Sequence, residues 1–118
     1  MLFLCYPKCS TCQKAQAYLD AHGATYDLRD IKADAPTRDE LAQWWRQSGL
    51  PLHRFFNTSG LLYRSLSLKE RLPGLTEEEQ LDLLASDGML VKRPILVTDD
   101  LVRVGFKEAE WAAVFAHE

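Results

Sequence analysis

The sequence lacks an excess of basic charge and lacks any long hydrophobic run. Its 14 Lys and Arg against 17 Asp and Glu give a formal net charge of -3 and a pI near 5.6. Direct nucleic-acid binding calls for a basic face, and a membrane-spanning helix calls for about 18 or more consecutive apolar residues. The sequence offers neither, so we expect no direct nucleic-acid binding and no membrane insertion.

Repeats, linkers and low-complexity segments are also missing, and the cysteine count is odd. The short apolar N-terminus has no positively charged segment before it, so it predicts a strand and not a secretory signal. Three cysteines cannot all pair within the chain, which favours a reducing cytoplasm. With 118 residues, 47% of them hydrophobic, the composition is ordinary for one globular domain. We expect a single domain over residues 1–118, acting as a monomer.

What the chain does have is a C-x-x-C motif, from Cys9 to Cys12. It lies between an apolar run at residues 1–4, which predicts a buried strand, and a helical pattern that ends at Gly23. The start of a helix offers unpaired N–H groups and the positive end of the helix dipole, which favour a thiolate at Cys9. Cys12 lies one helical turn deeper, where it can resolve a mixed disulfide formed at Cys9.

Other uses of the cysteines stay open beside thiol chemistry, which the motif favours. A permanent disulfide over so short a loop adds only about 2 kcal/mol in the chain-entropy model. Metal binding and inert packing of the pair are further alternatives. Together with Cys5 the spacing is C-x3-C-x2-C, which radical S-adenosylmethionine enzymes use to hold an iron–sulfur cluster, but 118 residues cannot build the partial barrel that these enzymes need. We expect Cys5 to be a buried small hydrophobe.

The rest of the chain predicts an α/β protein with a thioredoxin-like fold. A strand at residues 25–29 follows the first helix, and a hairpin at residues 95–104 precedes a terminal helix at 107–115. Between them lies a helical insertion at roughly 37–88, which includes two capping boxes, Thr37 to Glu40 and Thr76 to Glu79. The order is β-α-β, helical insertion, β-β-α, with the first two strands parallel and the last two antiparallel.

Pro94 stands directly before the third predicted strand. In the thioredoxin-like fold this position holds a proline with a cis peptide bond, set against the redox turn. We therefore predict a cis bond between Arg93 and Pro94, although cis bonds are uncommon even before proline. An ordinary trans proline at the start of an edge strand is the alternative.

With these features the chain resembles the glutaredoxin-type arsenate reductase-like proteins, a family that includes the Spx and MgsR regulators. The resemblance covers nearly all 118 residues and implies that Cys9 is the catalytic cysteine and Arg93 an arginine near it. Two further segments resemble a branch of small bacterial members. The segments that carry the resemblance are residues 6–12 (YPKCSTC), 92–95 (KRPI) and 104–108 (VGFKE), with 55–60 (FFNTSG) and 85–90 (ASDGML) for the branch.

The chain departs from the family pattern at two points. Arsenate reductases of this type carry a single active-site cysteine and three oxyanion-binding arginines. Here Cys12 is a second cysteine, and only Arg93 matches an arginine, because the other two positions fall on Asn57 and Phe106. Without these two arginines, which are charged bidentate hydrogen-bond donors, anion binding is weaker. We therefore expect weak arsenate reduction or none.

The sequence therefore predicts a thiol-disulfide oxidoreductase that acts on a small thiol or a disulfide protein. Cys9 would be the nucleophile, Cys12 the resolving thiol, and Arg93 a cation that lowers the thiolate pKa or holds a substrate carboxylate. Pro94 would supply a backbone contact for the bound thiol or peptide. We expect no bound cofactor, with glutathione or another low-molecular-weight thiol as co-substrate. The alternative is a redox-sensing regulator, in which the same pair reports oxidation and the surface binds RNA polymerase.

Overall fold

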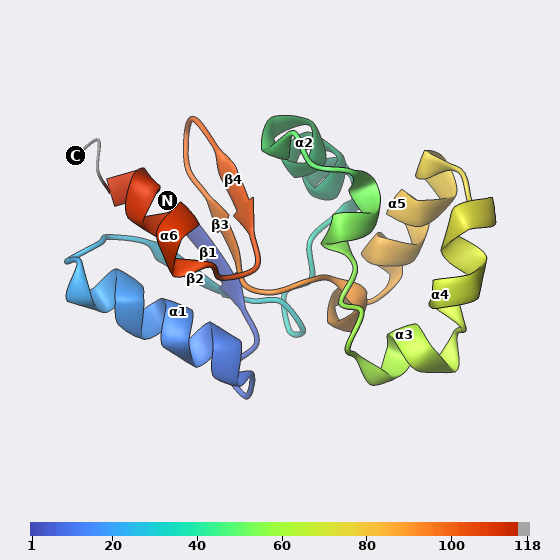
Figure 1. Cartoon of the computed structure of the whole chain (residues 1–118), viewed down its shortest axis with the longest axis horizontal. Coiled ribbons are helices and arrows are strands. Elements are labelled where there is room, and N and C mark those ends of the chain that lie inside the picture. Colours follow the sequence, from blue (N-terminus) through green and yellow to red (C-terminus); the bar gives the residue numbers. More distant parts are fainter. Residues whose placement is uncertain (116–118) are drawn as a thin grey trace.

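A computed structural model describes residues 1–115 and shows a mixed four-stranded sheet with helices on both faces (Figure 1). The sheet order is β2-β1-β3-β4. β1 pairs parallel with β2 and antiparallel with β3, which forms an antiparallel hairpin with β4. The chain thus has the predicted α/β, thioredoxin-like fold. The strands are β1 (Leu2–Cys5), β2 (Asp27–Asp30), β3 (Ile95–Val97) and β4 (Val102–Val104).

The helices follow the predicted order, and their boundaries lie close to the predicted ones. α1 (Ser10–Ala21) connects β1 to β2, and α6 (Glu108–Phe115) follows β4. The helical insertion lies between β2 and β3. It comprises α2 (Arg38–Ser48), α3 (Leu61–Ser65), α4 (Leu68–Arg71) and α5 (Glu77–Ser86), with the short 3-10 turns η1 (Leu52–Phe55), η2 (Leu72–Gly74) and η3 (Gly88–Leu90).

The two faces of the sheet bury two different hydrophobic clusters, because successive side chains of a strand point to opposite faces. Phe3 and Leu96 belong to a cluster with Trp111 of α6 and residues of α1. Leu4 and Ile95 belong to a larger cluster with the helical insertion. In Figure 1, α1 and α6 accordingly lie on the side of the sheet away from α3, α4 and α5. The C-x-x-C motif lies where the chain passes from β1 of this sheet into α1.

Both predicted capping boxes are present, and one of them extends into an ion pair. The Thr37 hydroxyl accepts from the Glu40 N–H, and the Glu40 carboxylate accepts from the Thr37 N–H; Thr76 and Glu79 repeat the arrangement at α5. Glu40 also accepts two hydrogen bonds from Arg29 of β2, at 2.7 and 2.9 Å. This pair ties the first helix of the insertion to the edge of the sheet. Over residues 1–115, no helix is long and apolar enough to cross a membrane.

Candidate active site

Cys9 caps the N-terminus of α1, immediately after the turn that leaves β1. Its backbone is extended, with φ -88° and ψ 124°, and its N–H donates to the Tyr6 carbonyl at 2.9 Å. The Cys9 side chain is half-buried, whereas Cys5 and Cys12 are 3% and 2% exposed. All three are free thiols. Of the three sulfurs, Cys9 is the one that a substrate can reach, and Cys5 is buried as predicted.

The surroundings of Cys9 favour its thiolate. Burial raises the pKa of this thiol, but the net effect is to lower the pKa below its ordinary value. The lowering comes from hydrogen bonds donated by the Cys12 and Thr11 backbone N–H groups, by the Cys12 thiol and by the Arg93 guanidinium. The Thr11 and Cys12 N–H groups belong to the first turn of α1, where a helix leaves N–H groups unpaired. The position of the motif predicted this effect on Cys9.

The two buried thiols behave in the opposite way. Burial raises the pKa of Cys12 to about 12, and the nearby Cys9 adds to the rise. The Tyr6 N–H opposes this, because it donates a hydrogen bond to Cys12 Sγ at 3.3 Å. Burial raises the pKa of Cys5 as well, with smaller contributions from Asp30 and Cys9. The pKa of the accessible Cys9 thiol is therefore lowered, whereas the pKa values of the two buried thiols behind it are raised.

Arg93 is held in place on several sides. Its Nη1 donates to the Met89 carbonyl at 3.1 Å, and its guanidinium carbon lies 5.5 Å from the centre of the Tyr6 ring. With its amide group oriented to suit its neighbours, the Asn57 side-chain oxygen accepts from Arg93 Nη1 at 3.1 Å and Nη2 at 3.3 Å. These contacts fix a positive charge beside Cys9 before any substrate binds.

The Arg93–Pro94 peptide bond is cis, as predicted. Pro94 itself is buried, and it is not among the residues that line the pocket beside Cys9. Its carbonyl accepts from the Gly105 N–H at 2.8 Å. That hydrogen bond joins the start of β3 to the end of β4.

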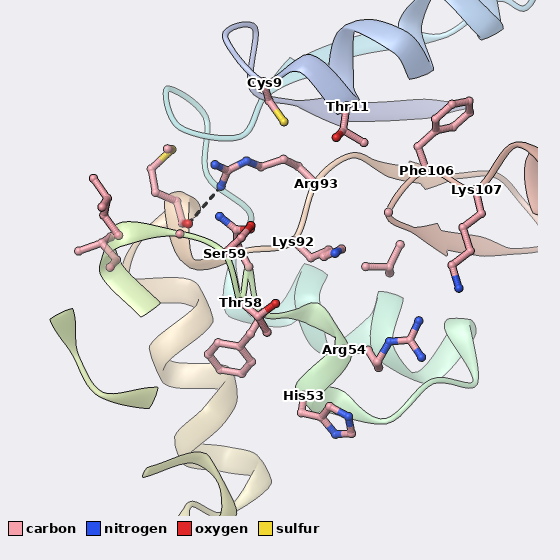
Figure 2. A pocket seen from close by; sticks show the side chains of 18 residues that line it. Cys9, Thr11, His53, Arg54, Thr58, Ser59, Lys92, Arg93, Phe106 and Lys107 are labelled. Atoms are coloured by element: carbon pink, nitrogen blue, oxygen red, sulfur yellow. Dashed lines mark hydrogen bonds between the residues drawn. The ribbon is translucent and has the colours of Figure 1, made fainter. Parts of the chain in front are cut away.

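Cys9 opens onto a pocket of about 850 Å³. Figure 2 shows the Cys9 sulfur and Thr11 on one side, with Arg93 on the loop below them and Arg54 and His53 farther from the sulfur. Among the residues of the described chain that line it, none is Asp or Glu. The lining residues are Cys9, Thr11, His53, Arg54, Phe56, Asn57, Thr58, Ser59, Gly60, Leu61, Leu62, Met89, Lys92, Arg93, Val104, Gly105, Phe106 and Lys107.

Sequence reasoning named Arg54 only as one of several donors that could fold into the site, and it did not predict that Arg54, Lys92 and Lys107 gather in this pocket. They come from η1, from the loop before β3 and from the segment before α6, so no local pattern connects them. Lys92 stands directly beside the predicted Arg93, which was the only signal available. These three cations lie in one pocket because the fold brings their separate segments together.

Asn57 and Phe106, at the expected arginine positions, do lie in the pocket wall. Asn57 contacts Arg93, as described above. The Phe106 ring packs against Trp111 and Tyr18, with ring centres 4.9 and 5.6 Å apart. Neither side chain carries a charge, so the positive charge of the two missing arginines is not replaced at these positions.

The cysteines are not arranged as a metal centre. Among residues 1–115, no group of three or more His, Cys, Asp or Glu side chains is placed to hold a metal ion. Cys5 and Cys12 instead pack into the hydrophobic cluster under α1 and α6, with Cys9 at its margin.

Comparison with known proteins places this site in a family. The model of the ArsC family matches residues 4–114. The chain belongs to the ArsC family. It is 49% identical over 111 residues to the uncharacterized protein YusI of Bacillus subtilis, a match that covers 94% of each chain. It is 28% identical over 110 residues to the regulatory protein MgsR of Bacillus subtilis, covering 93% of this chain and 86% of MgsR.

Solved structures of the ArsC family have the same fold. The crystal structure of an ArsC family related protein from Bacteroides fragilis matches with a TM-score of 0.94 at 53% identity, covering 96% of this chain and 95% of the other. The ArsC match spans the C-x-x-C motif, the cis-proline and all the pocket-lining segments. The resemblance noted in the sequence is thereby confirmed at the level of the family.

Proposed function

We propose that this ArsC family member is a thiol-disulfide oxidoreductase that uses Cys9 and Cys12 as its redox pair. The observation that carries the proposal is the contrast between the two thiols. Cys9 is accessible and its pKa is lowered, whereas Cys12 is buried with its pKa raised to about 12. A nucleophile must be ionised and reachable, and a resolving thiol must be protected until the nucleophile has reacted.

The reaction proceeds by two thiol-disulfide exchanges. The Cys9 thiolate attacks one sulfur of a substrate disulfide, forms a mixed disulfide with it, and expels the other sulfur as a thiolate. Cys12 then attacks Cys9 Sγ, expels the second substrate thiol, and closes the Cys9–Cys12 disulfide. The protein dithiol is oxidised and the substrate disulfide is reduced to two thiols. Two molecules of a low-molecular-weight thiol such as glutathione, as co-substrate, then return the protein to the dithiol: the first forms a mixed disulfide with the protein, and the second releases it as the oxidised thiol dimer.

The structure contains a reason for this order of steps. While Cys9 is a thiolate, it helps to keep the pKa of Cys12 high. Once Cys9 is in a mixed disulfide its negative charge is gone, and the Tyr6 N–H remains in place to stabilise a Cys12 thiolate. The Cys12 proton passes to the departing substrate thiolate. The reaction of Cys9 therefore removes one of the causes that raise the pKa of Cys12, while burial continues to raise it.

Arg93 and Pro94 support the pair in different ways. Arg93 contributes to the lowered pKa of Cys9, and a substrate carboxylate is a suitable partner for its guanidinium. Pro94 directly follows Lys92 and Arg93, which line the pocket together with Cys9. We assign Pro94 a positioning role, because its side chain is buried and its carbonyl is bonded to Gly105.

Turnover with a disulfide substrate tests the proposal. The reduced protein should reduce a small disulfide catalytically when glutathione and a glutathione-recycling system are supplied. Cys9→Ser should abolish turnover, and Cys12→Ser should accumulate a mixed disulfide on Cys9 that mass spectrometry detects. Cys5→Ser is the matched control and should turn over normally. Full turnover in the Cys9→Ser variant would contradict the proposal.

The likeness to the regulatory protein MgsR favours one second candidate function. In this reading the Cys9–Cys12 pair reports oxidation in the cytoplasm, and the surface binds RNA polymerase. Affinity capture of RNA polymerase by the reduced and by the disulfide form tests it. Redox-dependent capture that the Cys12→Ser variant loses would establish the regulator, and equal absence of polymerase from both forms would remove it.

A further inference from the structure

We propose that the pocket selects disulfides of peptide size that carry carboxylates away from the sulfur, and that Lys92, Lys107 and Arg54 bind these carboxylates. The inference deepens the proposed function and rests on it, because it names the substrate class that reaches Cys9. None of the three cations lies at an arginine position expected from the arsenate reductases.

The first observation is the charge of the pocket. The chain as a whole has a formal net charge of -3, yet Arg54, Lys92, Arg93 and Lys107 line one pocket into which no Asp or Glu of residues 1–115 projects. The ion pairs found within those residues join Arg29 and Arg38 to carboxylates elsewhere and involve none of the pocket cations. Cations that gather in a concave site without carboxylate partners attract anions and raise the local concentration of anions.

The second observation is where these charges lie. Arg93 is engaged by Asn57 and Met89 next to Cys9. Figure 2 shows the other cations farther from the sulfur, with Lys107 and Arg54 approaching from different elements. A ligand that only placed an anion beside Cys9 would leave them unused. The arrangement fits a ligand whose acidic groups lie several bonds away from the reacting sulfur.

Gly105 helps to place Lys92 in this group. It has φ +78°, a conformation that side chains other than glycine rarely adopt. A Cβ at this position would lie 3.2 Å from Lys92 Cε. The missing side chain leaves room for the Lys92 stem beside the segment that leads to Lys107.

The third observation is the size and lining of the pocket. A volume of about 850 Å³ is in the range of sites for small organic ligands, which is about 300–1,000 Å³. It is far larger than a tetrahedral oxyanion needs. Phe56, Leu62 and Met89 supply apolar wall next to the cations. A short peptide-like chain that ends in carboxylates can contact the apolar wall with its chain and the cations with its carboxylates.

In the reaction, the acidic half of the substrate is the half that Cys9 captures. The Cys9 thiolate attacks the sulfur attached to the acidic group, and the other half leaves as a thiolate. Cys12 then displaces the acidic thiol from Cys9. The carboxylates stay with the lysines through the mixed-disulfide stage, so the cations act on substrate binding and on its capture rate.

A pair of matched peptide disulfides tests the inference. One is the disulfide-linked dimer of a blocked Cys-Gly-Glu-Glu peptide, and the other is the same dimer with Gln in place of both Glu. In the glutathione-coupled assay at low salt, we expect the acidic dimer to have a kcat/KM about tenfold or more above the neutral one, a difference that added salt reduces. The double variant Lys92→Ala, Lys107→Ala should lose most of this preference, and Arg54→Ala part of it.

The control is a double variant with the same change in charge outside the pocket, Lys14→Ala with Lys69→Ala, which should keep the preference. Equal rates for the two dimers with unmodified protein would overturn the inference and leave the proposed function intact. A preference that survives in the Lys92, Lys107 variant would also overturn the assignment. Absence of turnover with both dimers and with small neutral disulfides would overturn the proposed function, and this inference with it.

Discussion

The backbone N–H of Tyr6 donates a hydrogen bond to Cys12 Sγ at 3.3 Å. The carbonyl of the same residue accepts from the Cys9 N–H at 2.9 Å. One turn residue therefore fixes both ends of the C-x-x-C motif, and its ring lies next to Arg93. The distance between the reactive thiol and its resolving partner depends on this turn as much as on the helix.

The first prediction concerns the order in which the thiols react. Alkylation at mildly acidic to neutral pH, followed by peptide mapping, should label Cys9 well before Cys5 or Cys12. The reason is that the pKa of Cys9 is lowered, whereas burial raises that of Cys12 to about 12 and also raises that of Cys5. The rate at Cys9 should rise with pH, with a midpoint below the pKa of an ordinary thiol. Preferential labelling of Cys5 or Cys12 would overturn the assignment.

The second prediction concerns Asn57 as a positioning residue for Arg93. Arg93→Gln should move the pH profile of Cys9 alkylation to higher pH, because it removes a charged hydrogen-bond donor from the thiolate. Asn57→Ala should move it in the same direction by a smaller amount, because it frees the guanidinium on one side. Arg54→Gln, a pocket cation that does not contribute to the lowered pKa, is the control. An Asn57→Ala profile identical to that of the unmodified protein would show that the other contacts suffice to hold Arg93.

The third prediction is that arsenate is a poor substrate. With glutathione and glutaredoxin supplied, arsenate turnover should be far below the rate of disulfide reduction. The physical reason is that Asn57 and Phe106 line the pocket without charge, and that Phe106 is packed against Trp111. Arsenate turnover as fast as disulfide exchange would mean that Arg54 or the pocket lysines replace the missing arginines.

The fourth prediction concerns acid stability. Hydrogen bonds from Arg29 lower the pKa of Glu40 from 4.5 to about 2. A carboxylate whose pKa is depressed on folding contributes stability above its ordinary pKa, and this contribution disappears as the pH falls from 4.5 toward 2. Glu40 remains 34% exposed, so solvent screening reduces the effect to about 1–2 kcal/mol.

Glu40→Gln tests this with little disturbance of the capping box, where glutamine is also suitable. Chemical denaturation should show a loss of stability at pH 7 that shrinks as the pH approaches 2. The matched control is Glu79→Gln, the same position in the second capping box, where no arginine is paired to the carboxylate. Equal losses for the two variants at pH 7 would contradict the role of Arg29.

The features that sequence predicted well are those encoded locally. The two capping boxes, opened by Thr37 and Thr76, mark where α2 and α5 begin, and the motif at Cys9 lies at a strand-helix junction. The cis bond before Pro94 followed from the fold that the order of elements indicated. The capping boxes and the motif are signalled by residues that are neighbours in the chain, whereas the cis bond was inferred from the order of elements along the whole chain.

The features that sequence did not predict are contacts between distant segments. Arg29 of the edge strand β2 meets Glu40 in the first turn of α2, a contact between segments that the sequence does not relate. The hydrogen bond from Arg93 to Asn57 depends on how the insertion returns to the sheet, and so does the gathering of cations in the pocket. Such contacts are set by tertiary packing, and no spacing of residues along the chain indicates them.

The central claim is that Cys9 and Cys12 form a reversible disulfide without help from Cys5. The most direct measurement is a titration in glutathione redox buffers of the unmodified protein and its Cys5→Ser and Cys12→Ser variants, read as intact mass after acid trapping. We predict a reversible two-electron change in the unmodified protein and in Cys5→Ser, and its loss in Cys12→Ser. If Cys5→Ser abolished the change while Cys12→Ser kept it, the disulfide would join Cys5 to Cys9, and the proposed site would be contradicted.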